Sequence, residues 1–74
     1  MAKRLWLMEA RLAKGLSRSD IATAVGIHET YIEKIENGTR TPRIPTAVRI
    51  GRVLGIPDIE IVGRFVKDQI SKVQ

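Results

Sequence analysis

Few residues of this sequence suit catalysis or metal binding, and their spacing forms no known reactive set. The 74 residues include no cysteine and a single histidine, His28. A thiolate metal site and a nucleophile with a histidine base and an orienting acid are therefore both missing. Asp58 and Glu60 are two residues apart on a predicted helix, where they point in different directions. No glycine-rich phosphate loop of the G-x-x-x-x-G-K-S/T type occurs. We expect no enzymatic activity, no metal and no cofactor.

The charge balance favours a polyanionic partner. Thirteen lysines and arginines stand against eight acids, which gives a net charge of +5. Nucleic acid is the first partner that such a surface suggests, and an anionic membrane surface is the second. No apolar run approaches the length of a membrane span, and the run that starts at Leu5 stops at Glu9. We expect a cytoplasmic protein with no membrane attachment and no small-molecule ligand.

Glycines and prolines divide the chain into helices. Four glycines each follow apolar residues at helical spacing, where a left-handed residue often ends a helix: Gly15, Gly26, Gly38 and Gly55. Helices are predicted over residues 3–14, 17–25, 28–37 and 45–54, with a last one over about 58–73. No segment alternates apolar and polar residues as a strand would. The sequence predicts an all-α fold, a compact five-helix domain that spans residues 1–74.

The second and third predicted helices are joined by a very short turn. Ser17 and Asp20 have the spacing of a capping box at the start of the second helix. Gly26 permits the positive φ of a sharp turn, and the small Ala22 lets two helices cross closely. Ile32 gives the third helix an inward face. These features predict a helix-turn-helix, in which the second helix of the pair is held out for insertion into a major groove.

Residues 11 to about 54 resemble the phage-repressor and Cro-like (XRE-type) helix-turn-helix family. The matching residues are Arg11, Gly15-Leu16-Ser17, Ile21-Ala22, Val25-Gly26, Tyr31-Ile32, Ile35-Glu36-Asn37-Gly38, Thr41-Pro42 and Leu54-Gly55. The resemblance implies a lambda-repressor-like fold. It also implies binding of double-stranded operator DNA, usually by a homodimer on a near-palindromic site, and a role in transcription regulation.

The resemblance also implies site residues. Base reading would fall to Glu29, Thr30 and Lys34. Contacts to the DNA backbone would come from Arg18, Tyr31, Asn37, Thr39, Arg40, Thr41 and Arg43. For Tyr31 the alternative is partial burial against the preceding helix. His28 is expected to cap its helix rather than to read a base. Arg43 stands where the family commonly has a serine that caps the fourth helix.

Three acids on the predicted reading helix need separate explanations in a basic chain. The resemblance implies that Glu36 forms a structural ion pair with Arg11 and ties the first helix to the third. Glu33 is expected to lie on the solvated face. Glu29 matches a base-reading position, where an acid can accept from the N4 amine of cytosine and also repels phosphates. It would reject wrong sequences as much as bind the right one.

The last helix carries two apolar faces. Ile61 and Phe65 form the face that we expect to pack inward. The second face is predicted to join two copies of the chain in a homodimer; it comprises Ile59, Val62, Val66, Ile70 and Val73. In the alternative, this stripe and the extra apolar residues of the first helix cover each other within one chain.

Two functions compete. The first is sequence-specific DNA binding by a repressor, an antitoxin or a controller protein of a restriction–modification system. The alternative is a protein-interaction module, or an antitoxin-type partner, that kept the scaffold and binds DNA weakly. The exposed acids favour the second slightly, and the basic loop after the third helix, which contains Arg40, favours the first.

Overall fold

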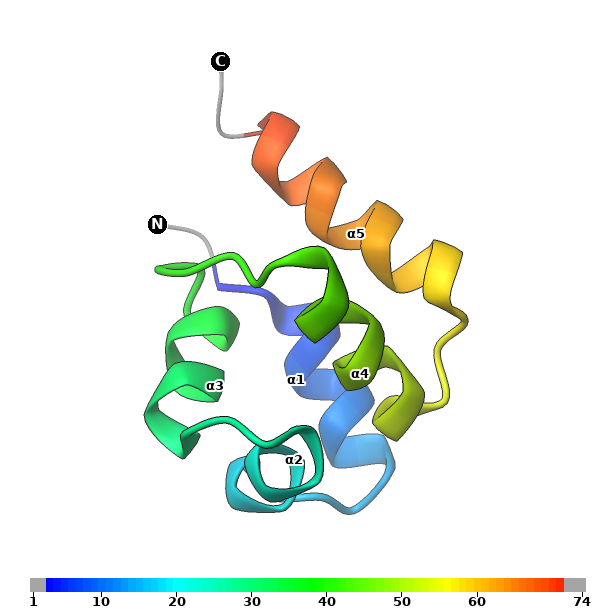
Figure 1. Cartoon of the computed structure of the whole chain (residues 1–74). Helices are drawn as coiled ribbons and strands as arrows, with labels where there is room; N and C mark the ends of the chain where they lie inside the picture. Colours follow the sequence, from blue (N-terminus) through cyan, green and yellow to red (C-terminus); the bar gives the residue numbers. More distant parts are fainter. Residues whose placement is uncertain (1–2, 72–74) are drawn as a thin grey trace. The chain divides into compact units, whose positions relative to one another are not determined.

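The computed structural model describes residues 3–71, and every regular element in that range is a helix. Two compact units make up the chain, Met1–Arg40 and Thr41–Gln74, and each is described by itself (Figure 1). The prediction of an all-α fold is confirmed. The prediction that the whole chain is one domain stays a prediction.

The first unit contains α1 (Leu5–Ala13), α2 (Arg18–Val25) and α3 (Glu29–Glu36). All three lie within their predicted ranges, and no helix end differs from its predicted position by more than two residues. The capping box at the start of α2 is present. The Asp20 N–H donates to Ser17 Oγ at 3.0 Å, and the Ser17 N–H donates to Asp20 Oδ2 at 2.9 Å. Hydrogen bonds from Ser17 hold the pKa of Asp20 below its usual value. The bond from the Ser17 N–H has the larger effect, and the bond from the Ser17 side chain has the smaller one.

The turn between α2 and α3 is as short as predicted (Figure 1). Gly26 adopts a φ of 82°, and its N–H closes α2 on the Ala22 carbonyl at 2.8 Å. His28 caps α3, since its Nδ1 accepts from the Thr30 N–H at 3.1 Å. α2 packs against α3, and α3 also contacts α1. The buried apolar side chains of this unit are Leu7, Ile21, Ala22, Val25, Ile32 and Ile35.

The second unit contains α4 (Ile44–Leu54) and α5 (Asp58–Ser71). Arg43 occupies the N-cap of α4 without a side-chain hydrogen bond, as its replacement of a capping serine suggested, and Pro45 lies in the first turn. Gly55, with a φ of 74°, ends α4. The buried apolar side chains are Ala47, Ile50, Leu54, Ile61 and Phe65.

Gly51 on α4 lies close to Ile61 on α5. A Cβ built on Gly51 would lie 2.7 Å from Ile61 Cγ2 and 3.0 Å from the Ile56 carbonyl oxygen. The position is helical and has no positive φ, so the need for glycine comes from space and not from backbone conformation. On α5, Gly63 has no atom within 4 Å of the same added Cβ.

The apolar stripe predicted to form the dimer interface is only partly exposed to solvent. Ile59, Val66 and Ile70 expose 87%, 48% and 64% of their surface. Val62 is half-buried. Val73 lies outside the described residues. Ile61 and Phe65 are buried, as the sequence predicted for the inward face.

The two glycines predict opposite effects of one substitution. Gly51→Ala should destabilise the protein by about 1–3 kcal/mol, because the new methyl group overpacks the contact with Ile61. Gly63→Ala is the matched control and should stabilise it by about 0.5–1 kcal/mol, because alanine loses less backbone entropy in a helix. Urea unfolding of both variants measures the difference. A gain in stability for both would show that α4 and α5 are further apart at Gly51 than described.

Candidate nucleic-acid interface

The outer face of α3 carries the three residues expected to read bases. Glu29, Thr30 and Lys34 are all exposed. Thr30 and Lys34 are four residues apart and therefore share one face of the helix. Glu33 is also exposed, as predicted, and Tyr31 is half-buried, so part of its side chain stays accessible. The opposite face of α3 is buried through Ile32, Ile35 and Glu36.

The loop after α3 is fixed by hydrogen bonds to the last turn of the helix. The Lys34 carbonyl accepts from the N–H groups of Thr39 at 2.9 Å and Arg40 at 3.2 Å. The Gly38 N–H donates to the Ile35 carbonyl at 3.2 Å. The side chains of Thr39 and Arg40 are exposed, and Asn37 is half-buried. A basic and polar loop is therefore held directly beside the end of α3.

Two expected backbone contacts, Thr41 and Arg43, belong to the second unit. Thr41 is half-buried and Arg43 is exposed. Because Arg43 makes no capping hydrogen bond at α4, its guanidinium has no structural task at that helix end.

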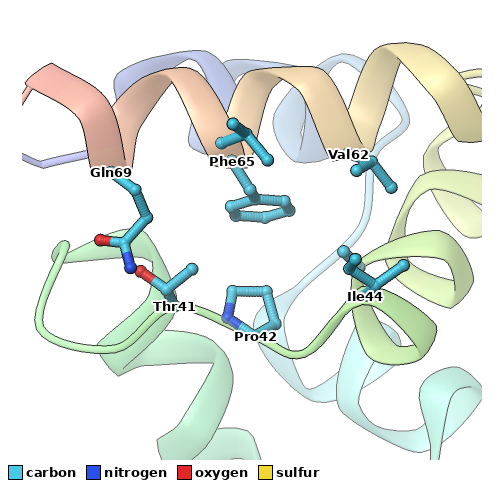
Figure 2. A pocket seen from close by; sticks show the side chains of 8 residues that line it. Thr41, Pro42, Ile44, Val62, Phe65 and Gln69 are labelled. Atoms are coloured by element: carbon cyan, nitrogen blue, oxygen red, sulfur yellow. The ribbon is translucent and has the colours of Figure 1, made fainter.

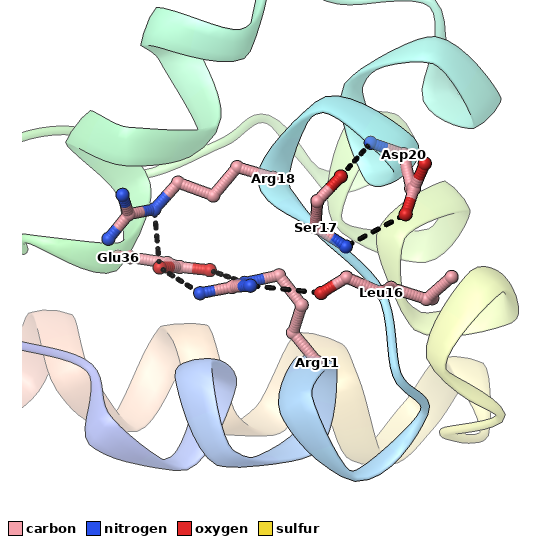
Figure 3. A network of polar contacts seen from close by, with 6 residues as sticks. All are labelled: Arg11, Leu16, Ser17, Arg18, Asp20 and Glu36. Atoms are coloured by element: carbon pink, nitrogen blue, oxygen red, sulfur yellow. Dashed lines mark hydrogen bonds and ion pairs between the residues drawn. The ribbon is translucent and has the colours of Figure 1, made fainter.

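Glu36 is buried and holds two arginines (Figure 3). Arg11 Nε lies 2.6 Å from Glu36 Oε2, so the two residues that the resemblance paired are in contact. Arg11 also donates from its NH1 group to the Leu16 carbonyl at 2.9 Å. Arg18 Nε lies 3.0 Å from Glu36 Oε1, an interaction that the sequence did not predict. The side chains of Arg11 and Glu36 are 9% and 1% exposed, whereas that of Arg18 is 35% exposed.

This cluster explains the acid at the end of α3. One carboxylate is shared by two guanidiniums, so the cluster keeps a net positive charge at the start of α2. Charge-assisted bonds of this kind fix side-chain geometry more firmly than neutral ones. Glu36 therefore joins α1, α2 and α3 and offers no negative charge to solvent. Arg18 is held through Nε while about a third of its side chain stays exposed.

Arg4 is a second buried arginine, and nothing in the sequence indicated its role. It is 3% exposed, and its NH1 group donates to the carbonyls of Ile35 at 2.6 Å and Arg40 at 2.8 Å. Its own N–H donates to the Glu36 carbonyl at 2.7 Å. In the sequence it follows Lys3 and has the look of an ordinary surface charge near the chain start. No motif marks it.

The described residues offer neither a metal site nor a membrane span. Residues 3–71 contain no group of three or more His, Cys, Asp or Glu side chains arranged to hold a metal ion. Within the same residues, every helix is too short or too polar to traverse a bilayer.

The Glu36 cluster predicts a non-additive pair of substitutions. Arg11→Met should cost about 3–5 kcal/mol of unfolding free energy, because a buried carboxylate loses its most enclosed partner. Arg11→Met combined with Glu36→Leu should cost less than Arg11→Met alone, because the buried carboxylate, which Arg11→Met leaves with only the part-exposed Arg18, is then removed as well. Arg18→Gln in the same cycle is the control, and its coupling to Glu36 should be weaker since Arg18 reaches solvent. Urea unfolding measures all of these, and additive losses for Arg11 and Glu36 would contradict the pairing.

Comparison with known proteins agrees with this geometry. Residues 7–61 match a family model described as helix-turn-helix. The chain is 42% identical over 52 residues to YqaF of Bacillus subtilis (strain 168), an uncharacterized HTH-type transcriptional regulator; the match covers 70% of this chain and 68% of YqaF. It is 29% identical over 52 residues to y4dJ of Sinorhizobium fredii, another uncharacterized HTH-type transcriptional regulator, with the same coverage of each chain. The α2–turn–α3 pair lies wholly inside the range that the family model matches, and the chain belongs to the Cro/C1-type helix-turn-helix family.

Proposed function

We propose that this chain is a sequence-specific regulator of transcription, of the repressor or Cro type, that binds double-stranded operator DNA. The observation that carries this proposal is the construction of α3. Its inner face is buried, and its outer face presents Thr30 and Lys34. A helix of this kind fits the major groove. The family match and the names of the relatives support the same function.

Base reading and backbone contact are assigned to different residues. Lys34 suits guanine O6 and N7, and Thr30 suits a thymine methyl group. Arg40, in the loop after α3, suits a phosphate. Arg18 would meet a phosphate with its terminal nitrogens, because its Nε donates to Glu36. The remaining backbone contacts are assigned to Tyr31, Asn37, Thr39, Thr41 and Arg43.

The alternative is a protein-interaction module or an antitoxin-type partner with weak DNA binding. Glu29 and Glu33, both exposed on α3, are the observation in its favour. A salt titration on random duplex separates the two. A DNA-binding protein loses affinity steeply as salt rises, whereas an interaction module has little duplex affinity to lose.

We also propose that the regulator is a homodimer joined through α5. Ile59, Val66 and Ile70 are apolar side chains left exposed on that helix. Beside them lies a hollow of about 60 Å³, in which Phe65 and Val62 from α5 face Pro42 and Ile44 (Figure 2). An open apolar surface of this kind gains stability by pairing with a partner. A two-fold pair would place two copies of α3 about 34–36 Å apart, one turn of DNA, to read a near-palindrome.

The division of contacts predicts different effects for two basic residues. Lys34→Ala should relax the preference at one base position and weaken the best site by on the order of 1–3 kcal/mol. Arg40→Ala should weaken all duplexes alike and flatten the slope of log affinity against log salt by about one unit. Binding of each variant to the selected site and to random duplex, measured across a salt series, tests both. A change of base preference in Arg40→Ala but not in Lys34→Ala would reverse the assignment.

The dimer predicts a change of mass on substitution of the α5 stripe. Sedimentation equilibrium at tens of micromolar should give twice the chain mass for the parent. It should give the chain mass for Val66→Glu combined with Ile70→Glu, because carboxylates cannot be buried in the interface without partners. Lys67→Glu is the control, since it changes the net charge on the same helix by as much and lies outside the stripe. A parent that is monomeric, or a double variant that still dimerises, rules this interface out.

A further inference from the structure

We infer that Arg4 is a positioning residue for the DNA-contact loop, Asn37–Arg40; this rests on the proposed function. Arg4 precedes α1 in the chain, yet its NH1 group donates to the end of α3 and to the loop. Being 3% exposed, it cannot itself contact a phosphate. Its influence on DNA must therefore pass through the groups that it holds.

The peptide groups on both sides of Arg40 are held. On one side the Arg40 N–H donates to the Lys34 carbonyl at 3.2 Å. On the other side the Arg40 carbonyl accepts from the Arg4 NH1 group at 2.8 Å. The same NH1 group bonds the Ile35 carbonyl at 2.6 Å, which fixes the loop relative to the last turn of α3. The exposed Arg40 side chain therefore starts from a fixed base.

Arg4 adds a donor at the end of α3, where the Ile35 carbonyl also accepts from the Gly38 N–H at 3.2 Å. The last carbonyls of a helix have no intrahelical partner, and the C-terminal end carries partial negative charge. A buried guanidinium at that end meets both needs. The Arg4 N–H bond to the Glu36 carbonyl, at 2.7 Å, holds the backbone of Arg4 in the same place. Without Arg4, the Arg40 carbonyl loses a charge-assisted bond.

Fixing the loop before binding lowers the entropy lost when Arg40 meets a phosphate. Arg4 thereby contributes to affinity without touching DNA. It should have no influence on base preference, because its NH1 group donates to the Ile35 and Arg40 carbonyls, which come after the residues assigned to base reading.

A double-mutant cycle in DNA binding tests this assignment. Arg4→Met should weaken the selected site and random duplex by the same factor and flatten the salt slope by up to about one unit, the size of one phosphate contact. In an Arg40→Ala background, Arg4→Met should flatten the slope no further and weaken binding less than it does in the parent, because the other assigned contacts of the loop, Asn37 and Thr39, carry no charge. Lys3→Met is the control for charge alone, since it removes the same charge from the neighbouring exposed residue. Arg4→Lys should restore part of the slope, because one ammonium can donate to both carbonyls.

A purely structural role gives a different result. Arg4→Met would then lower the unfolding midpoint, but the folded fraction would bind with the parental salt slope, and its loss would multiply with that of Arg40→Ala. That outcome, or an equal effect of Lys3→Met, overturns the inference. Parent protein without salt-dependent duplex affinity would instead overturn the proposed function.

Hydrogen exchange tests the positioning without DNA. In Arg4→Met the amides of Thr39 and Arg40 should exchange faster than in the parent, while the α2 amides keep their protection. Arg4→Lys, the milder variant, should give a smaller change of the same sign and serves if Arg4→Met does not fold. Unchanged exchange at Arg40 in every folded variant overturns the inference.

Discussion

The burial of one carboxylate constrains the whole first unit. A charge removed from water must be paired, or it costs several kcal/mol. Glu36, on the last turn of α3, meets this requirement with Arg11 from α1 and Arg18 from the first turn of α2. Each of the three helices supplies one member, so a shift of any helix would break a charged contact. The orientation of α3 relative to α1 and α2 is therefore fixed by a polar interaction as well as by the apolar contacts of Ile32 and Ile35.

The same requirement changes the meaning of the net charge. A basic chain suggests a cationic surface for a polyanion, but Arg4 and Arg11 are buried and bound to carbonyls and a carboxylate. Part of the positive charge thus stabilises the first unit itself. The positive charge that stays accessible lies on fewer side chains, among them Lys34, Arg40 and the exposed third of Arg18. The count of basic residues therefore overstates the charge available for the proposed contact with DNA.

Signals between residues close in the sequence predicted the helices. Contacts that long side chains make between distant parts of the sequence were missed. The capping box at Ser17 and the left-handed glycines act over a few residues, so the sequence set the helix ends to within one or two positions. Arg11–Glu36 came from the family resemblance. The Arg18–Glu36 contact spans 18 residues and the Arg4–Arg40 contact spans 36, and neither leaves a periodic signal. Gly51 looked like any small helical residue, because its constraint is a contact with Ile61 on another helix.

Glu29 bears both on the stability of α3 and on the proposed binding of DNA. It lies in the first turn of α3, where a carboxylate is stabilised by the positive end of the helix dipole. In the proposed complex the same carboxylate approaches a negatively charged backbone, which weakens binding to every duplex alike. A cytosine can donate a hydrogen bond from its N4 amine to this carboxylate. That bond offsets the repulsion at one base position only. Glu29 then separates sites by weakening the wrong ones, and Lys34 and Arg40 must supply the affinity it removes. This arrangement works only if the cations are held firmly, and for Arg40 that is the role inferred for Arg4.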